Sequence, residues 1–391
     1  METRQKVIVA VIVLLIGGIV YVYFFGNAAK RADKQIDINN APKVGVVDDT
    51  PKNPENVSPI SGLPCADWQR RPIAVMQPAD VSARPAAGFS EADIVFELPV
   101  FTGSNTRLMG VYLCTIPLDI GSMRSARHDY IPLAKSLDAV FVHWGYSKFA
   151  ETLLERKIID NIDCLTTSFC PRWLQTGKMK YEDTGHITKD GIDQAMQKYG
   201  YRTTGTFSGY PHQDEKALEE RPASGHLRLA FPNPYDVSYD YDRASNTYLR
   251  TWNQSVDTDK NNGQRIAPKN VVVMFAQSEQ IKLATDYTAR GVQNPWDLVP
   301  VEERAGLDYG GVGRYNNLEM GDPWFDTKDS GDAYFYFNGQ QYHGSWKKDK
   351  SKLESKLAFF DEAGNEVKFV PGQIWVEVLE PGQGLKWEPG A

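Results

Sequence analysis

Two arginines and a serine stand within four residues in the sequence RSAR, directly before a segment that is predicted to be helical. Guanidinium groups and the free backbone N–H groups of a helix start both favour carboxylate or phosphate, and Ser125 is a candidate N-cap. Arg124, Ser125 and Arg127 are therefore predicted to bind an anion. The alternative is that both arginines pair with carboxylates of the chain itself. The candidate partners are Glu91, Asp93 and Glu97.

A carboxylate and a further arginine lie on two neighbouring predicted strands. Glu97 ends the segment ADIVFE, and Arg107 lies near the start of NTRLMGVY. If these strands pair, the two side chains are expected to face each other as a charge-assisted pair. Such a pair serves either as a structural salt bridge or as part of a binding site. Arg84, in the motif ARPAAGF, completes the candidate ligand-binding residues of this region.

Histidines offer a second kind of chemistry. His143 follows the apolar segment AVFV, where a strand meets a loop, and such positions often carry site residues. His186 begins a polar stretch. Both are candidate ligand-binding residues, and the alternative for each is a hydrogen-bonded structural role. A Ser125–His143–Asp129 triad is disfavoured because no G-x-S-x-G elbow is present, whereas a hydrolase would need Glu97, His143 and His186 in one cleft.

Four cysteines, Cys65, Cys114, Cys164 and Cys170, limit the redox setting and the metal chemistry. An even number suits an oxidising compartment, and Cys164 and Cys170 are close enough to close a short loop. Cys114, in GVYLC, is equally consistent with a small buried apolar residue. No C-x-x-C motif or His/Cys cluster is present, so neither a zinc site nor another metal or cofactor is predicted.

Several tryptophans fall at positions where two roles are open. Trp346 and Trp375 lie in predicted strands and are expected in the core. Trp68, Trp144 and Trp173 lie in predicted loops near the candidate site. Exposed rings there would stack on a sugar or clamp a peptide, and the alternative is packing beneath the loops.

A hydrophobic segment near the N-terminus is predicted to anchor the chain in a membrane. Residues 7–25 read VIVAVIVLLIGGIVYVYFF, without charge or proline, which is about long enough to cross a ~30 Å hydrocarbon core as a helix. A cleaved signal peptide is the alternative, although its apolar run is usually only about 7–15 residues long. The run does not end in a cysteine, so a lipoprotein signal is not expected. Lysines and arginines at 30, 31 and 34 leave the orientation open.

The remainder of the chain exceeds what one hydrophobic core usually serves, so two domains are predicted. The expected fold class is α+β, with a transmembrane helix before an α/β domain and a β-rich domain. The predicted segments are a cytoplasmic tip at 1–6, a transmembrane anchor at 7–25, a disordered linker at 26–58, an N-terminal α/β domain at 59–202, a connector at 203–230, a β-rich C-terminal domain at 231–382 and a tail at 383–391.

Hydrophobic patterning places the elements that must position these residues. In the first domain it predicts strands at 71–76, 92–100, 106–113 and 139–145, and helices at 129–137, 151–159 and 188–199. In the second it predicts strands at 270–277 and 372–379, and hairpins at 238–252, 332–346 and 356–369. The hairpin at 332–346 has Asn338-Gly339 at its tip, which is the strongest short-range hairpin signal.

Motifs over most of the chain resemble one bacterial family. PISGLP, RRPIAVM, ARPAAGFSEADIVFE, NTRLMGVY, IGSMRSARHDYIPLA and VHWG are similar to the N-terminal part of the YerB lipoprotein family, whose domain has no known function. APKNVVVMFA, DAYFYFNGQQYHGSWKK and FFDEAGNEVKFVPGQIWVEV resemble its C-terminal part. The resemblance covers roughly residues 58–382 in the expected order. It implies a bacterial, membrane-attached protein of the cell surface and supplies no established reaction.

Three departures from the family pattern stand out. The lipobox cysteine is absent, and the predicted transmembrane helix stands in its place. Phe101 lies near the position of the family's second acidic residue, and His186 in DTGHIT is all that remains of a later P/E-H-N/T motif. These departures argue against an activity that depends on the second carboxylate.

The function predicted from these observations is that of a non-catalytic module on the outer face of a cell membrane. Its expected partner is an anionic cell-wall component or an envelope protein. The alternatives are an extracellular hydrolase of cell-wall material and a structural partner that docks through the β-rich domain. The net charge of −7, with no long block of lysine or arginine, argues against a nucleic-acid partner.

Overall fold

The computed structural model describes residues 54–101, 103, 105–282, 284–290, 297, 300–302, 304, 316–318, 329–349 and 351–390. The predicted anchor at 7–25 lies outside these residues. Among the helices of the described part, none combines the length and the apolar character that crossing a membrane requires.

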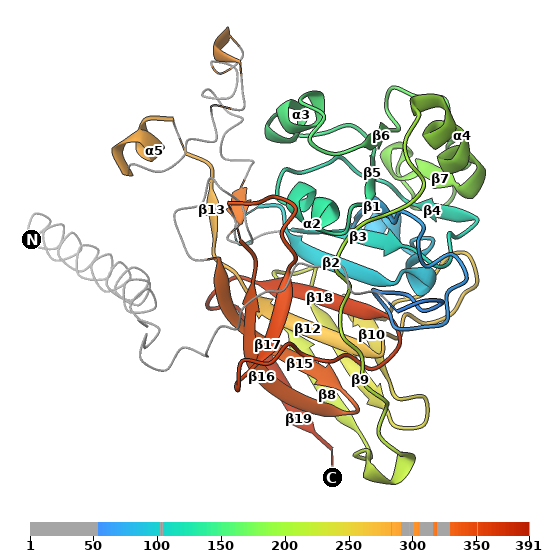
Figure 1. Ribbon diagram of the computed structural model, residues 1–391, viewed down its shortest axis with the longest axis vertical. Coiled ribbons are helices and arrows are strands. Elements are labelled where there is room, and N and C mark those ends of the chain that lie inside the picture. Colours follow the sequence, from blue (N-terminus) through green and yellow to red (C-terminus); the bar gives the residue numbers. More distant parts are fainter. Residues whose placement is uncertain are drawn as a thin grey trace, which may run out of the picture. The chain divides into compact units, whose positions relative to one another are not determined.

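A ten-stranded mixed sheet forms the centre of the described fold (Figure 1). In spatial order its strands are β17 (Ala358–Asp361), β16 (Gln340–Lys347), β15 (Ser330–Phe337), β12 (Asn270–Phe275), β18 (Ile374–Leu379), β2 (Ile94–Pro99), β3 (Thr106–Tyr112), β1 (Ile73–Pro78), β5 (Val140–His143) and β6 (Asn161–Asp163). Strands β1, β2, β3 and β18 are buried along their whole length. Both faces of the sheet are therefore covered, which explains why these segments read as continuous apolar runs.

Most central strands of this sheet run in the same direction. Strand β1 is parallel to β5, β5 to β6, β2 to β18 and β18 to β12. Strand β3 alone reverses this direction between β1 and β2. The carboxyl ends of β1, β2 and β5 consequently lie at the same edge of the sheet as the first residues of β3.

Helices cover the half of the sheet formed by β1, β2, β3, β5 and β6. Helices α2 (Tyr130–Ser136) and α3 (Lys148–Glu155) pack on one face, with Phe96, Met109 and Phe141. Helix α4 (Lys189–Tyr199) packs on the other face, through Ile192, Ala195 and Met196. Side chains cap both longer helices, because Ser147 accepts from the backbone of Ala150 and Thr188 from that of Gly191.

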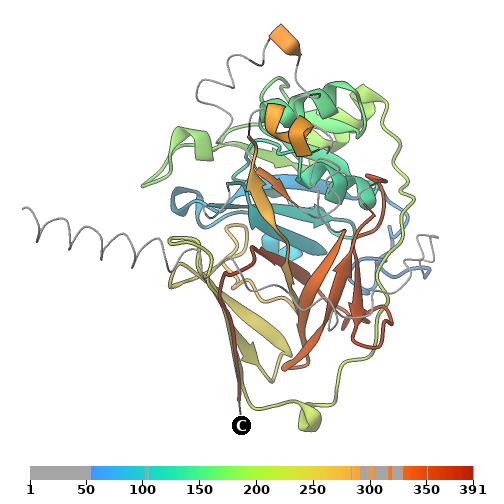
Figure 2. The ribbon, with the colours of Figure 1, turned by 90° about the vertical axis from the view of Figure 1, so that its left-hand side faces the viewer.

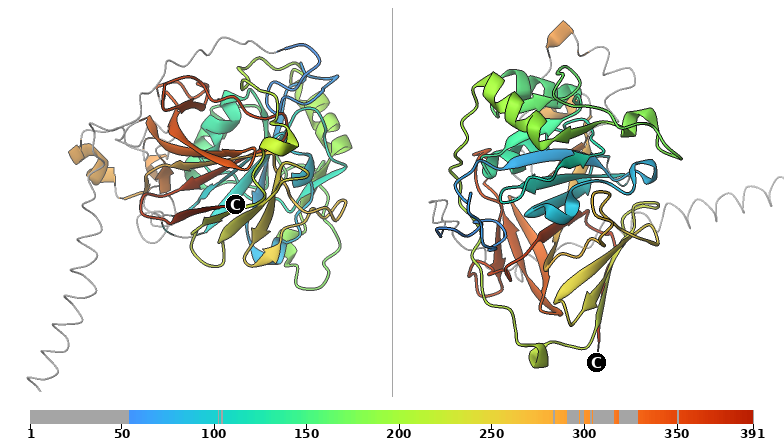
Figure 3. Two further views of the ribbon diagram at one scale, coloured as in Figure 1. Left: turned by 90° about the horizontal axis from the view of Figure 1, so that it is seen from below. Right: turned by 90° about the vertical axis from the view of Figure 1, so that its right-hand side faces the viewer.

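A second, five-stranded antiparallel sheet covers the other half of the large sheet. Its order is β11 (Ser255–Val256), β10 (Thr247–Trp252), β9 (Val237–Asp242), β8 (Gly225–Leu229) and β19 (Leu385–Pro389). Alternate residues face inward, and Tyr239 and Tyr248 pack against Val271, Val273 and Tyr336 of the large sheet. Figures 2 and 3 (right) show the yellow strands of this sheet and the orange-red strands of the large sheet as separate layers.

Small elements complete the described fold. They are the pair β4 (Asp119–Gly121) and β7 (His186–Thr188), the pair β13 (Ser278–Gln280) and β14 (Asn316–Leu318), helix α5 (Ala284–Arg290), and the 3₁₀ turns η2 (Val81–Ala83), η3 (Phe89–Glu91), η4 (Tyr181–Asp183) and η5 (Leu218–Glu220).

The structure confirms a sheet-dominated α+β fold and most of the predicted elements, with three corrections. The helix predicted at 151–159 spans Lys148–Glu155, because Ser147 starts it earlier. The hairpin predicted at 356–369 forms around a single named strand, β17. Its second arm bonds back to β17, because Asp361 donates to the carbonyl of Asn365 and Val367 to that of Phe359, and it then turns away where the backbone of Phe369 donates to the carbonyl of Pro211. Strands β8 and β19 lie where a connector and a tail were predicted.

Strands from both sides of the predicted connector share the large sheet. Strand β18, late in the chain, pairs in parallel with β2, with Glu377 opposite Glu97. The part of the connector before β8 runs along the side of the large sheet (Figure 2), and the backbone of Gln213 donates to the carbonyl of Phe369. The domain boundary itself stays a prediction, but the two segments are joined by continuous strand pairing.

Two disulfides hold loops of the first segment. Cys164 pairs with Cys170, a disulfide that their short spacing allowed but left open, and Cys65 pairs with Cys114. The alternative that Cys114 is merely a small buried apolar residue is therefore wrong. Cys65 lies in the turn-rich segment before β1 and Cys114 follows β3, so the second disulfide ties that segment to the sheet.

Candidate functional site

The segment that carries RSAR lies between the carboxyl ends of two parallel strands. The backbone of Arg124 donates to the carbonyl of Met76 on β1, and its own carbonyl accepts from Trp144 after β5. The chain moves from β1 to β2 and β3 on one side and then to β5 on the other. This is a point where strand order reverses, and in open α/β sheets ligands bind outside the carboxyl ends of strands at such points.

Arg107 reaches the same place from the start of β3. It lies opposite Pro78 of β1 and Leu98 of β2. Arg107 as a whole is 8 % exposed to solvent. Its guanidinium donates one hydrogen bond, to the carbonyl of Ser125 at 2.7 Å, and forms no ion pair within the described part of the chain. Burial, followed by the positive charge of Arg127, lowers the pKa of Arg107 well below its ordinary value.

Arg127 lies beside Arg107 and binds the same stretch of backbone. Its guanidinium donates to the carbonyl of Ala126 at 3.0 Å and approaches that of Ser125 at 3.5 Å. Two guanidinium groups thus converge on the carbonyls of one short segment. We call Arg107, Ser125 and Arg127 the arginine site. The sequence predicted all three residues, and the structure brings them together.

Arg124 is neutralised by the chain itself, although by none of the carboxylates that were predicted. It forms an ion pair with Asp183, which is fully buried, and donates to the carbonyl of Glu182 at 2.7 Å. Asp80 lies 3.6 Å away on the other side. Arg124 therefore positions the loop that contains η4 next to the arginine site and has little capacity left for a ligand.

Asp80 and Tyr235 are two polar residues near the arginine site that the sequence did not predict. The Tyr235 hydroxyl donates to Asp80 at 3.3 Å, and burial, together with Asp80, raises the pKa of Tyr235 to about 12. Tyr235 precedes β9, so the second half of the chain contributes to a site whose other residues come from the first half. A pairing over this sequence distance leaves no local signal.

Glu97 does not pair with Arg107, and that prediction is wrong. Glu97 lies opposite Leu108, so its side chain and that of Arg107 leave the sheet on opposite faces. Glu97 instead forms a fully buried ion pair with Arg250 of β10, and it also accepts from the hydroxyl of Thr106. This pair joins the two sheets.

Further charges surround Arg250 between the sheets. Asp257 pairs with Arg250 and also with Arg84, whose guanidinium donates to it at 2.9 Å. Arg84 also lies over the ring of Trp252. We call Arg84, Glu97, Arg250, Asp257 and Glu377 the buried ion cluster. Arg84 and Glu97, predicted to bind a ligand, thus belong to this structural cluster and not to the arginine site.

Glu377 lies 3.8 Å from the Arg250 guanidinium, which also pairs with Glu97 and Asp257. One of its oxygens accepts from the Tyr239 hydroxyl, and the other is buried without a hydrogen bond from any described residue. Burial, and then the negative charge of Glu97, raise the pKa of Glu377 to about 8. A protonated carboxyl in this position avoids the cost of burying a third negative charge.

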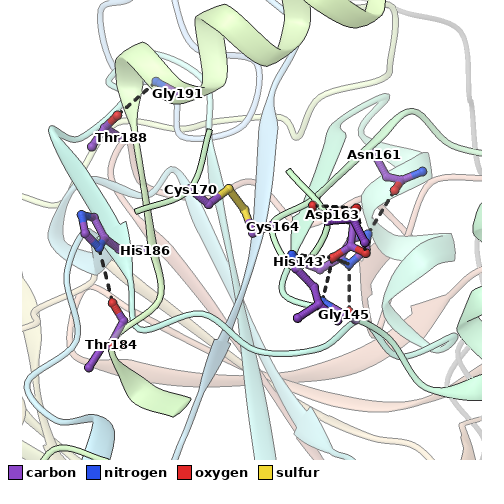
Figure 4. Close-up of a disulfide and its surroundings, with 12 residues drawn as sticks. His143, Gly145, Asn161, Asp163, Cys164, Cys170, Thr184, His186, Thr188 and Gly191 are labelled. Carbon is purple, nitrogen blue, oxygen red and sulfur yellow. Dashed lines mark hydrogen bonds and ion pairs between the residues drawn. A yellow bond between two sulfur atoms is a disulfide. The ribbon is translucent and has the colours of Figure 1, made fainter. Parts of the chain in front are cut away.

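His143, the last residue of β5, belongs to a separate hydrogen-bonded group (Figure 4). Its two ring nitrogens lie 2.8 Å from the carbonyl of Gly145 and 3.1 Å from the side chain of Asn161. The ring is fully buried, and burial lowers the pKa of His143. Asp163 lies 3.8 Å away and also binds the backbone of Gly145, so His143 shapes the loop beside the arginine site.

His186 lies in a different environment from His143 and contacts different residues. In the view of Figure 4 the Cys164–Cys170 disulfide lies between the two histidines. His186 stacks on Trp173 at 4.5 Å and lies 3.4 Å from Asp119, and burial lowers its pKa. Glu97, His143 and His186 each have their own set of partners, so no shared proton-transfer group connects them.

Two of the predicted loop tryptophans, Trp144 and Trp173, contact other side chains, and both predicted core tryptophans are buried. Trp346 and Trp375 are fully buried. The Arg172 guanidinium carbon lies 4.2 Å from the centroid of a Trp144 ring, and the Lys260 ammonium nitrogen lies 3.2 Å from that of a Trp173 ring. Among the described residues, no group of three or more His, Cys, Asp and Glu side chains is arranged to hold a metal ion.

Comparison with known families identifies the chain. Residues 60–202 match a protein of unknown function (DUF3048) N-terminal domain, and residues 227–294 and 312–376 match the corresponding C-terminal domain. The chain belongs to the DUF3048 family. The resemblance predicted from the motifs is thereby confirmed, and the two DUF3048 domains are the segments whose strands share the ten-stranded sheet.

A curated relative and a solved structure agree with this assignment. YerB of Bacillus subtilis (strain 168), whose name marks it as a candidate lipoprotein, is 24 % identical over 329 residues, which cover 82 % of this chain and 86 % of YerB. The crystal structure of YerB superposes with a TM-score of 0.66 at 21 % identity, covering 84 % of this chain and 99 % of that one. This second match shows the DUF3048 fold and carries no information on ligands.

Proposed function

We propose that this DUF3048 protein is a membrane-anchored module of the bacterial cell envelope that binds an anionic ligand at the arginine site. The ligand class is a carboxylate or phosphate of a cell-wall component or of an envelope protein. The module is non-catalytic in this proposal, because Glu97, His143 and His186 occupy three different environments.

The observation that carries the proposal is the environment of Arg107. Arg107 is a buried residue, and among the described residues its guanidinium donates a single hydrogen bond, to a carbonyl. The burial of such a charge is costly unless it is paired. Arg127 adds a second positive charge beside it. A carboxylate or phosphate would accept two parallel hydrogen bonds from such groups and offset their mutual repulsion. The position at a strand-order reversal supports the same assignment.

Attachment to the outer face of the membrane rests on separate observations. The segment 7–25 has the composition of a spanning helix. The named relative YerB is a candidate lipoprotein, and a lipid anchor and a spanning helix serve the same purpose of tethering a surface protein. The two disulfides are typical of proteins in an oxidising compartment, such as the outside of the cell.

Co-sedimentation of the full-length chain with purified bacterial cell walls tests the binding proposal. Wild type is expected in the pellet, and Arg107→Gln and Arg127→Gln are each expected to reduce the bound fraction by about tenfold, which corresponds to the loss of one charge-assisted contact. Arg228→Gln is the matched control, because Arg228 is an exposed arginine on β8. Equal retention of all four proteins would overturn the assignment of the arginine site.

A further inference from the structure

Strand β19 is the last strand of the five-stranded sheet and has an unpaired edge within the described part of the chain. It pairs with β8 in the register of Leu385 with Leu229, and the carbonyl of Gly384 accepts from the backbone of Ala230. In an antiparallel pair, alternate residues bond to the partner strand. The backbone groups of Leu385, Trp387 and Pro389 therefore point away from β8.

Proline at the end of β19 agrees with this orientation. Pro389 has no N–H to donate, and proline is tolerated in strands where the missing donor would face away from the sheet. The N–H and C=O groups of Leu385 and Trp387 remain as a short row of main-chain donors and acceptors. Such a row is the complement of one further extended strand.

A groove lies beside this edge, between the two sheets. It has a volume of about 430 Å³ and is lined by Phe275, Tyr334, Gln341, Leu385 and Trp387. The ring centroids of Trp387 and Tyr336 are 5.2 Å apart, and those of Tyr334 and Phe275 are 6.3 Å apart. The walls of the groove are therefore largely aromatic. A strand added to β19 would direct alternate side chains into this groove, because inward-facing residues alternate along a strand.

Acidic side chains lie near Tyr334, beyond the residues that line the groove. Tyr334 lies opposite His343 in the β15–β16 pair, and two residues away Asp332 shares its face of the sheet. His343 bridges Asp332, at 3.9 Å, and Glu362, at 2.8 Å. Two carboxylates against one imidazole favour a cationic side chain and disfavour the anion expected at the arginine site.

We propose that the β19 edge and its aromatic groove bind an extended peptide by strand addition. The peptide would pair its backbone with Leu385 and Trp387, place an apolar side chain against Trp387 and Tyr334, and direct a lysine or arginine toward Asp332 and Glu362. This mode of recognition derives affinity from main-chain hydrogen bonds and specificity from alternate side chains. The inference does not depend on the arginine site.

Selection from a phage-displayed library of random short peptides, with the full-length chain as target, tests this inference. Enriched peptides are expected to alternate apolar and polar positions, to contain lysine or arginine and to lack proline. Their affinity, measured by fluorescence anisotropy, is expected to fall by about tenfold or more in Leu385→Pro, which removes one outward N–H, and in Trp387→Ala. Lys386→Ala is the matched control, because Lys386 is exposed on the opposite face.

Modified peptides and a second site variant separate the mechanisms. Two methylated versions of an enriched peptide are compared, one carrying N-methyl groups on its odd-numbered residues and one on its even-numbered residues. Only one edge of the peptide pairs with β19, so one version is expected to lose binding and the other to keep it. Equal effects of the two methylation patterns, unchanged affinity in Leu385→Pro, or a library without enrichment would each overturn the proposal. Arg127→Gln is expected to keep its peptide affinity, so failure at the arginine site is distinguishable from failure here.

Discussion

Arg250 on β10 forms an ion pair with Glu97 on β2, and neither side chain is exposed to solvent. The pair connects the five-stranded sheet with the ten-stranded sheet and the C-terminal family domain with the N-terminal one. Because the pair is shielded from water, neither charge can be solvated when its partner is lost.

Replacement of Arg250 by methionine is expected to destabilise the fold strongly. The change leaves Glu97 as a buried carboxylate without its cation and leaves Asp257 with Arg84 alone. Breaking a buried pair in this way typically costs about 3–5 kcal/mol. Urea unfolding of the full-length chain measures the effect. Arg228→Met on the exposed face of β8 serves as control and is expected to change the unfolding free energy by less than about 0.5 kcal/mol. A loss at Arg250 no larger than in this control would contradict the role of the pair.

Glu377 is expected to make stability fall as the solution becomes more alkaline. Its pKa is about 8 in the fold, against an ordinary value of 4.5. Between these values the folded chain retains a proton that the unfolded chain releases, so stability declines with rising pH by at most about 1.4 kcal/mol per pH unit. In Glu377→Gln this slope is expected to disappear.

Urea unfolding at a series of pH values from about 5 to about 9 measures both slopes. Glu388→Gln controls for general effects of removing a carboxylate, because Glu388 lies exposed on β19. Identical pH profiles for wild type and Glu377→Gln would show that Glu377 is ionised in the fold, contrary to the account.

Local elements were predictable from the sequence because their signals are local. Continuous apolar runs identified β1, β2 and β3, and Asn338-Gly339 identified the β15–β16 hairpin. The sequence LKWEP of β19 carries a proline and two charges, as suits an edge strand, and thus resembled a tail. Ser125 and Arg127 of the RSAR motif lie beside Arg107, as their predicted common site requires, and the binding of an anion there stays a prediction.

Pairings over long distances were not predictable. Glu97 and Arg107 lie on adjacent strands, but a register difference of one residue decides whether two side chains share a face. The true partner of Glu97 is separated from it by 153 residues, and Tyr235 reaches Asp80 across 155. Such contacts depend on the packing of the two sheets, for which a single sequence contains no direct signal.

The two disulfides are expected to differ in their contribution to stability. Cys65 and Cys114 are 49 residues apart, whereas Cys164 and Cys170 are 6 apart. On chain-entropy grounds the longer loop contributes about 4 kcal/mol and the shorter about 2 kcal/mol. Urea unfolding of Cys65→Ser/Cys114→Ser and Cys164→Ser/Cys170→Ser measures the two effects. A larger loss in the second variant would contradict the prediction.

Loss of the Arg124–Asp183 pair is expected to loosen the loop that carries η4. Asp183 is fully buried, and it holds Arg124 next to the arginine site. Asp183→Asn removes the charge and retains the shape, so amide hydrogen exchange is expected to accelerate in residues 171–185 and to stay unchanged in β1 and β2. Asp190→Asn, on the exposed side of α4, is the control. Unchanged exchange in the loop would show that Arg124 does not position it.

The central claim, that Arg107 and Arg127 form an anion site, is tested most directly by the stability of the full-length chain as a function of phosphate concentration. Ionic strength is held constant with chloride, so that only specific binding registers. A ligand that binds the folded state alone stabilises it by about 2.7 kcal/mol at a concentration one hundred times its dissociation constant. Wild type and Arg228→Gln are predicted to gain stability with phosphate along the same saturating curve, whereas Arg107→Gln and Arg127→Gln are predicted to gain almost none. Equal gains in all four proteins, or no gain in wild type, would contradict the account.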